Sequence, residues 1–171
     1  MNVADRIAGW LHEKEITTIF GIIGAGNIAI FNAVARLAKT EIVCCHHEQA
    51  AVMSAGSFFR VSGRLSVAIV TTGAGSTNAI TGVVAAHMDS TPVLVISGNE
   101  ASKYLGERTR VLGVQGYDSV GMVVAHTKWA NRAHIDVPIL AQLEIAYENA
   151  MNPRQGPCWL DIPKDIQNAV V

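Results

Sequence analysis

Short apolar runs alternate with longer helical segments along nearly the whole chain, and this alternation restricts the fold more than any other feature. The runs are rich in β-branched residues and bounded by turn residues, which is typical of β-strands. The expected strands cover residues 17–22, 41–45, 65–71, 92–97, 128–133 and 159–162. A glycine- and charge-rich stretch at residues 98–116 predicts a long loop instead.

Helical segments lie between these runs. The expected helices cover residues 3–13, 27–39 with Asn27 as the N-cap, 48–61, 76–87, 117–124, and 136–151 with Pro138 in its first turn. Strands that are apolar on both faces and alternate with helices form parallel sheets that are covered on both sides. The sequence therefore predicts an α/β fold with a parallel six-stranded sheet and helices on both faces.

The overall composition restricts the kind of partner. Half of the 171 residues are hydrophobic and only 16% are charged, so one domain can fill its core and still leave apolar surface for an interface. The net charge is −1 and no basic block is present, which excludes nucleic-acid binding through phosphate neutralisation. Because glycine, aspartate or histidine interrupts every long apolar run, we expect no membrane span.

The N-terminal residues and the cysteines indicate the compartment. Residues 1–15 are expected to form an amphipathic helix with acidic residues in its first turns, not a signal peptide. The chain has three cysteines, an odd count that we interpret as reduced thiols. The sequence thus predicts a cytoplasmic protein.

Polar or glycine-rich segments follow four of the expected strands. Ligands of parallel α/β sheets bind beyond the carboxyl ends of the strands. Each of these segments would lie at that edge: GAGN (24–27), HHEQ (46–49), TTGAGSTN (71–78) and SGNE (97–100). We therefore expect four loops to converge on one site.

The adjacent residues Cys44, Cys45, His46 and His47 raise the question of a metal site. Successive side chains of a strand point to opposite faces, so four neighbours do not close a tetrahedral shell without a sharp bend. No suitably spaced CxxC or HxxxH pair occurs elsewhere in the sequence, and a Cys/His nucleophile lacks an orienting motif. We interpret both cysteines as small hydrophobic residues of a buried strand, and both histidines as packing or polar groups at a helix entry.

The segment GAGNIA (24–29) matches a loose form of the dinucleotide fingerprint, because it follows a strand, opens a helix and is followed by the acidic Glu48. Two features speak against this interpretation: a helix precedes the first strand, and a second glycine loop follows the third. A nicotinamide dinucleotide-binding domain remains an alternative. It would predict hydride chemistry and ligand binding without a partner chain.

Glu48 lies between an apolar strand and an apolar helix. An acidic residue at this place can simply favour the helix macrodipole. It can also be a carboxylate in a dry setting, where exchange of a proton near neutral pH becomes feasible.

Four segments together resemble the pyrimidine-binding domain of thiamine diphosphate enzymes, and especially that of the acetolactate synthases. They occur in the family's order and at similar spacing, and the resemblance covers nearly the whole chain. They are FGIIGAGN (20–27), HHEQAA (46–51), GRLSVAIVTTGAGSTNAITGVVAAHMDSTPVLVISG (63–98) and GPCWLDIPKDI (156–166). The resemblance implies that residues 1–171 form a single pyrimidine-binding domain.

The resemblance also implies a role for each site residue. Glu48 would bind N1′ of the aminopyrimidine ring of thiamine diphosphate and so activate the cofactor, which decarboxylates a pyruvate-like 2-keto acid and transfers the product. The remaining cofactor-binding residues would be Gly24, Ala25 and Gly26 on the substrate side, Thr72, Gly73 and Asn78 beside the pyrimidine, and Gln115.

The chain departs from the family pattern at two places. The family often has Pro-Gly-Gly in the first glycine turn and Phe-Gln-Glu around the glutamine. This chain has Ile23-Gly24-Ala25 and Val114-Gln115-Gly116. These differences leave the acceptor substrate open.

The sequence contains no GDG…N magnesium motif, which the family carries on its diphosphate-binding domain. The resemblance therefore implies a split enzyme: thiamine diphosphate is shared with a partner chain that binds Mg²⁺, in an α2β2 assembly. The small residues of segment 75–88 permit close packing at such an interface. A catalytically inactive scaffold is a further alternative, and the presence of Glu48 argues against it.

Overall fold

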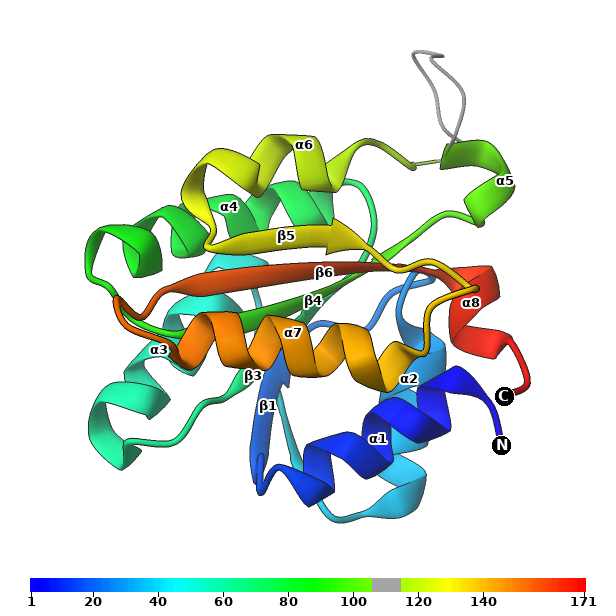
Figure 1. Ribbon diagram of the computed structural model, residues 1–171, viewed down its shortest axis with the longest axis horizontal. Coiled ribbons are helices and arrows are strands. Elements are labelled where there is room, and N and C mark those ends of the chain that lie inside the picture. The colour runs from blue at the N-terminus through cyan, green and yellow to red at the C-terminus, as the bar shows by residue number, and fades with distance from the viewer. Residues whose placement is uncertain (106–114) are drawn as a thin grey trace.

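The computed structural model describes residues 1–105 and 115–171. They form one six-stranded sheet in the order β2-β1-β3-β4-β6-β5, and every neighbouring pair is parallel (Figure 1). The strands are β1 (Thr18–Gly21), β2 (Glu41–Cys44), β3 (Val67–Val70), β4 (Val93–Asn99), β5 (Trp129–Arg132) and β6 (Pro157–Pro163). The predicted fold class, a parallel six-stranded α/β sheet, is confirmed.

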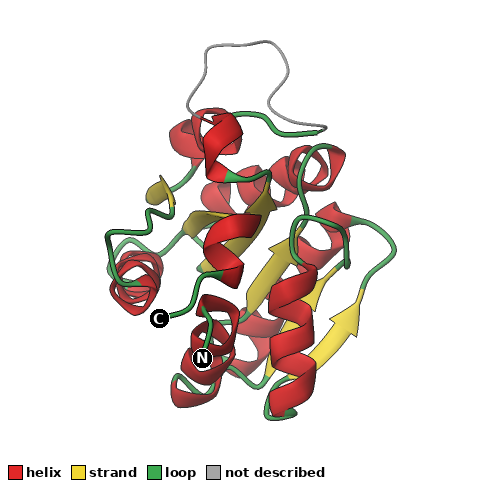
Figure 2. Cartoon of the chain, turned by 90° about the vertical axis from the view of Figure 1, so that its right-hand side faces the viewer, coloured by secondary structure: helices red, strands yellow, loops and turns green. Residues whose placement is uncertain are grey.

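Helices cover both faces of the sheet, as Figures 1 and 2 show. One face carries α1 (Val3–Glu13), α2 (Ile28–Leu37), α7 (Ile139–Met151) and α8 (Lys164–Asn168). The other face carries α3 (Glu48–Ser62), α4 (Ala74–Met88) and α6 (Ser119–Val123), which continues into the 3-10 turn η1 (Val124–His126). The short α5 (Ser102–Leu105) follows β4.

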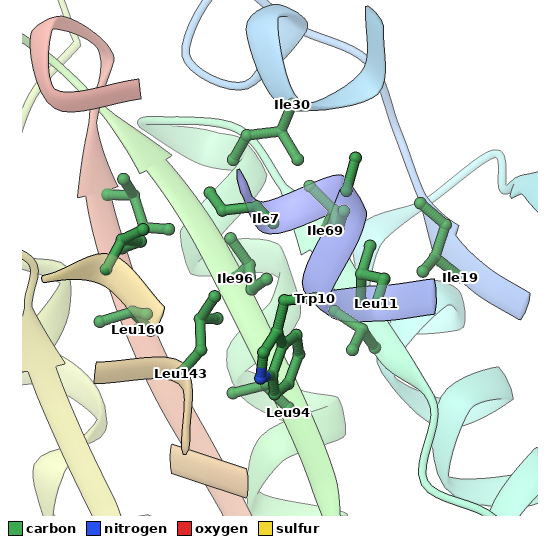
Figure 3. Close-up of a cluster of buried hydrophobic side chains, with 14 of the residues drawn as sticks. Ile7, Trp10, Leu11, Ile19, Ile30, Ile69, Leu94, Ile96, Leu143 and Leu160 are labelled. Atoms are coloured by element: carbon green, nitrogen blue, oxygen red, sulfur yellow. The ribbon is translucent and has the colours of Figure 1, made fainter. Parts of the chain in front are cut away.

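The core consists of two hydrophobic layers because alternate residues of a strand face opposite sides of the sheet. In β3, Val67 and Ile69 join the layer under α1, whereas Ala68 and Val70 join the layer under α3 and α4. The first layer is built from large side chains, among them Ile7, Trp10, Leu11, Ile19, Ile30, Ile69, Leu94, Ile96, Leu143 and Leu160 (Figure 3).

The second layer uses smaller residues, so α3 and α4 approach each other closely. A Cβ atom on Gly82 of α4 would lie 2.7 Å from the Cβ of Val52 in α3. Only glycine allows this approach without a shift of the helices. The small residues of the predicted helix 76–87 therefore allow close packing within the chain.

Strand β2 lies at the edge of the sheet and is not buried as predicted. The interpretation of Cys44 and Cys45 as buried hydrophobic residues is therefore wrong: Cys44 is exposed and Cys45 is half-buried. An edge strand has a neighbour on one side only, and the local sequence does not encode strand order.

Several element boundaries differ from the predictions. Helix α4 starts at Ala74, earlier than expected, and α7 starts after Pro138, which occupies the N-cap. Part of the predicted loop 98–116 is regular, since β4 extends to Asn99 and α5 follows it. Residues 106–114 of that loop lie outside the described residues.

The two ends of the chain lie side by side (Figures 1 and 2). The backbone N–H of Val171 donates to the carbonyl of Met1 at 3.1 Å, and Asn2 forms a β-bridge with Val170. No helix in the described part of the chain has the length and apolar character needed to cross a membrane.

Candidate functional site

The loops that follow β1 and β3 meet at the centre of the carboxyl edge. These two strands are neighbours, but the chain leaves β1 toward β2 on one side and leaves β3 toward β4 on the other. Such a switch in strand order opens a crevice in which parallel sheets bind ligands. The loops are joined directly, because the N–H of Gly26 donates to Oγ1 of Thr71 at 3.0 Å.

Glu48 stands beside this crevice as the first residue of α3. Its side chain is buried, with 8% exposure, and its Oε2 accepts a hydrogen bond from Nδ2 of Asn78 at 3.0 Å. Among the residues that the structure describes, no group donates a hydrogen bond to Oε1. One carboxylate oxygen is thus fixed from α4, whereas the other is not held by a donor in the described part of the chain.

His47 holds the entry to this helix. It occupies the N-cap position of α3, and its Nδ1 accepts a hydrogen bond from the N–H of Gln49 at 3.2 Å. The predicted polar role at the helix entry is confirmed for His47. His46 is exposed, and no cluster of three or more His, Cys, Asp or Glu that could hold a metal occurs in the described ranges.

The second glycine loop, residues 73–75, lies against Glu48. Gly73 forms the N-cap of α4 and has φ 65° and ψ −129°. Residues other than glycine rarely adopt this backbone conformation. A Cβ atom on Gly75 would lie 2.6 Å from Cγ2 of Thr71 and 3.3 Å from Oε1 of Glu48. The two glycines keep backbone surface open next to the carboxylate.

The first glycine loop, residues 24–26, is closed by its own hydrogen bonds. The N–H of Gly24 donates to Oδ1 of Asn27 at 2.8 Å, and the N–H groups of Asn27 and Ile28 both donate to the carbonyl of Gly24 at 3.1 Å. Asn27 occupies the N-cap of α2, as predicted, but its side chain makes no capping hydrogen bond to the helix. Its side chain bridges the loop instead, and its Nδ2 donates to the carbonyl of Ile22 at 3.0 Å.

These bonds bear on the dinucleotide alternative. A dinucleotide fingerprint binds pyrophosphate with free backbone N–H groups at the start of a helix. The N–H groups of Gly24, Gly26, Asn27 and Ile28 all donate within the protein. Four backbone donors of this segment are therefore used within the protein, which argues against that alternative.

The three residues of the first loop differ in exposure. Ala25 is exposed and Gly24 is half-buried, whereas Gly26 is buried. The carbonyl of Gly26 accepts a hydrogen bond from Nε2 of Gln167 at 2.6 Å, and a Cβ on Gly98 would lie only 1.9 Å from the same oxygen. Gly26 thus anchors the turn, whereas Ala25 is exposed.

A buried polar network lies below the second loop. Oγ1 of Thr72 is 3.2 Å from two acceptors, Oδ1 of Asn99 and the carbonyl of Gln115. Nδ2 of Asn99 donates to both oxygens of Asp161, which is fully buried and also accepts from Nε of Arg132 at 3.0 Å. Burial raises the pKa of Asp161 above its ordinary value, and the hydrogen bonds from Asn99 and Arg132 oppose this rise.

Gln115 lies over the second loop. A Cβ on Gly73 would be 3.0 Å from the Cβ of Gln115, so the two residues are in contact. Thr72, Gly73 and Gln115 are therefore brought together, and Asn78 joins Glu48. Val114, at which the chain departs from the family pattern, lies outside the described residues.

Sequence reasoning missed Thr71, which touches Gly24, Gly26 and Gly75 and so joins both glycine loops. It also missed Asn99 and Asp161. The sequence places a second threonine next to Thr72, but it does not indicate which of the two faces the first loop.

A cavity of about 650 Å³ lies on the face of the sheet that α1, α2 and α7 cover, away from α3 and α4. Its lining comes from α1, α2 and the start of α7 and includes Gly9, Trp10 and Arg36. It contains none of the site residues named above, and the chemistry of the carboxyl edge does not involve it.

Comparison with known proteins assigns most of the chain to the family that the sequence motifs resemble. Residues 1–126 match the model of the family described as thiamine pyrophosphate enzyme, N-terminal TPP binding domain. The acetolactate synthase large subunit of Buchnera aphidicola subsp. Schizaphis graminum is 36% identical over 166 residues, which is 95% of this chain and 28% of that protein.

Two further relatives agree. The acetolactate synthase isozyme 3 large subunit of Escherichia coli is 35% identical over 168 residues, 96% of this chain and 28% of that protein. A probable acetolactate synthase large subunit of Methanocaldococcus jannaschii is 31% identical over 171 residues, 100% of this chain and 28% of that protein. The chain spans less than a third of the length of these relatives.

Proposed function

The chain belongs to the thiamine pyrophosphate enzyme family through its N-terminal TPP-binding domain, and from this premise we propose that it activates thiamine diphosphate in an acetolactate synthase-like enzyme. The observation that carries the proposal is the buried carboxylate of Glu48 at the switch point of the sheet. Its retention also argues against an inactive scaffold. All of residues 1–171 act as one pyrimidine-binding domain in this proposal.

The residues around Glu48 fit an aminopyrimidine ring. Asn78 orients the carboxylate through Oε2, so Oε1 is available to share a proton with a ring nitrogen. Gly75 keeps the space beside Oε1 free of a side chain, which suits a flat ring placed against backbone. When bound, thiamine diphosphate supplies the electron sink for decarboxylation of a 2-keto acid.

The other loops orient substrate and cofactor. Thr72, Gly73 and Gln115 form one wall beside the ring, held by the contacts described above. Gly24 and Ala25 face the substrate on the other side of the crevice, and Gly26 fixes their turn through Thr71. The substrate is a pyruvate-like 2-keto acid, and carboligation is the expected outcome.

A second protein unit completes the site in this proposal. Thiamine diphosphate is shared with a diphosphate-binding domain, which also holds Mg²⁺ and lies on a partner chain in an α2β2 assembly. The surface of α3 and α4 supports this, because α4 is apolar on most sides and Met53 and Met88 are exposed there. The enzyme works in the cytoplasm, where its three free cysteines stay reduced.

Substitution Glu48→Gln tests the proposal. The chain is co-expressed with the open reading frame that neighbours its gene, and the purified complex is assayed for pyruvate consumption with thiamine diphosphate and Mg²⁺. We expect turnover to fall by about 10²-fold or more, because an amide does not share its proton as a carboxyl group does. The thermal unfolding midpoint should change little.

The matched control is Glu13→Gln, which removes an exposed carboxylate of α1. This variant should retain full turnover. If Glu48→Gln also retained it, the role assigned to Glu48 would be wrong.

A further inference from the structure

Asp161 is a fully buried acidic residue of β6, the strand next to the edge strand β5, and no hydrogen bond among the described residues joins it to a predicted site residue. It lies near the carboxyl end of β6, a strand in which every residue is buried. A buried carboxylate is costly, and an apolar residue in its place is often neutral or stabilising. Its presence calls for a role other than stability.

The hydrogen bonds of Asp161 fix the orientation of Asn99. An ionised carboxylate only accepts hydrogen bonds, and Arg132 balances its charge. Both oxygens of Asp161 face Nδ2 of Asn99, at 3.1 and 2.9 Å. A reversed amide would place its oxygen against the carboxylate, so Oδ1 of Asn99 must point away from Asp161.

Asn99, oriented in this way, holds two segments of the site. Its Oδ1 lies 3.2 Å from Oγ1 of Thr72, in the loop after β3, and it also accepts from the N–H of Glu100 at 2.9 Å. Its Nδ2 donates to the carbonyl of Tyr117 at 3.2 Å. Thr72 in turn reaches the carbonyl of Gln115.

Segment 115–117 is therefore held at both ends. The one hydroxyl hydrogen of Thr72 is shared between Oδ1 of Asn99 and the carbonyl of Gln115, and Asn99 also reaches the carbonyl of Tyr117. Gln115 is held through Thr72, and Tyr117 is held directly. Arg132 adds a third connection, because its guanidinium also lies 3.4 Å from Oδ1 of Asp118. The described contacts thus connect the buried carboxylate of Asp161 to the segment at residues 115–118.

We propose that Asp161 is a positioning residue, which acts through Asn99 to hold Thr72 and Gln115 at the site. The claim that these two residues face the cofactor rests on the proposed function. The positioning itself does not, because it concerns only groups of this chain.

Exchanging the two side chains tests the proposal. In Asn99→Asp, two carboxylates meet and the bond to the Tyr117 carbonyl is lost, so both ties weaken. In the double variant Asn99→Asp/Asp161→Asn, the new carboxylate accepts from Thr72, from the N–H of Glu100 and from the new amide. The tie to Thr72 returns, whereas the tie to Tyr117 does not, because a carboxylate has no N–H to donate.

Hydrogen–deuterium exchange of the full chain, without cofactor, measures how firmly each of the two segments is held in these variants. We expect Asn99→Asp to speed amide exchange about fivefold in both segments, 71–75 and 115–118. The double variant should restore segment 71–75 to near the wild-type rate and leave segment 115–118 fast. The control Thr40→Val, which removes a buried hydrogen bond to the Ile16 carbonyl, should change neither segment.

Two results would overturn the proposal: equal acceleration throughout the sheet in Asn99→Asp, or unchanged exchange in both segments. If Asn99→Asp does not fold, Asp161→Asn replaces it. Its amide nitrogen would meet Nδ2 of Asn99, donor against donor, so both segments should again exchange faster while β1 and β2 do not.

Titration of the partner-bound complex with thiamine diphosphate separates this inference from the proposed function. The half-saturation concentration should rise about fivefold in Asn99→Asp, with a smaller change in kcat. Faster exchange with unchanged half-saturation would support the positioning role and contradict the placement of the cofactor beside Thr72 and Gln115.

Discussion

The two Gly-Ala-Gly sequences of this chain, residues 24–26 and 73–75, are identical in sequence but differ in structure. In the first, the helix begins only after Asn27, and the backbone N–H groups of Gly24 and Gly26 donate within the protein. In the second, Gly73 adopts a positive φ and caps the helix at once, so that Ala74 and Gly75 are already helical.

The residue that follows each sequence accounts for the difference. Asn27 folds its side chain back onto the N–H of Gly24 and closes a turn. Ser76 donates instead to the carbonyl of Thr71 at 2.6 Å and contacts Ser97, which draws the helix start toward β3 and β4. A repeated glycine motif therefore does not identify a ligand loop by itself. The groups that it leaves free decide its role.

The largest effect is expected from Gly98→Ala, which tests whether the first loop is locked to β4. The added Cβ would lie 1.9 Å from the carbonyl oxygen of Gly26 and 2.9 Å from the N of Asn27, both backbone atoms. We expect a loss of about 3 kcal/mol or more in the free energy of unfolding, measured by urea titration. Gly9→Ala in α1 is the control, since nothing lies within 4 Å of its Cβ. If both variants were equally stable, the close contact between the first loop and β4 would not distinguish the two loops.

Gly73→Ala should have the next largest effect and acts on the second loop. The positive φ is strained for alanine, and the new Cβ would press on Gln115 at 3.0 Å, so we expect a loss of about 1–3 kcal/mol. Thiamine diphosphate should also bind more weakly, as measured by titration of the assembled enzyme. Gly63→Ala has a similar φ of 71° but open space around it, and should lower stability without changing cofactor binding. A cofactor effect in both variants would contradict the local role of Gly73.

The smallest effects are expected from Asn27→Ala and Ser76→Ala, which remove the residue that shapes each loop. Each loses two buried polar contacts, at a cost of about 1–2 kcal/mol. Amide exchange should rise at residues 22–27 in the first variant and at residues 71–76 in the second. If either variant loosened both segments equally, the two loops would form one unit and their separate roles would be lost.

The sequence predicted the sheet well because its central strands contain continuous apolar runs, VAIV in β3 and VLVI in β4. It failed at Cys44 and Cys45, since burial of a strand depends on its place in the sheet. Glu48 and Asn78 were predicted separately, and the structure adds the hydrogen bond between them. Thr71, Asn99 and Asp161 could not be predicted as a group, because only the strand order β3-β4-β6 brings them side by side.

The adjacent chain ends have a consequence for how such a module can be built into larger proteins. Both ends lie with α1 and α8 on one face of the sheet, whereas Glu48, α3 and α4 lie on the other (Figure 1). Any polypeptide joined at that corner would leave the domain on the side of α1 and α8, without passing over α3, α4 or the buried carboxylate of Glu48.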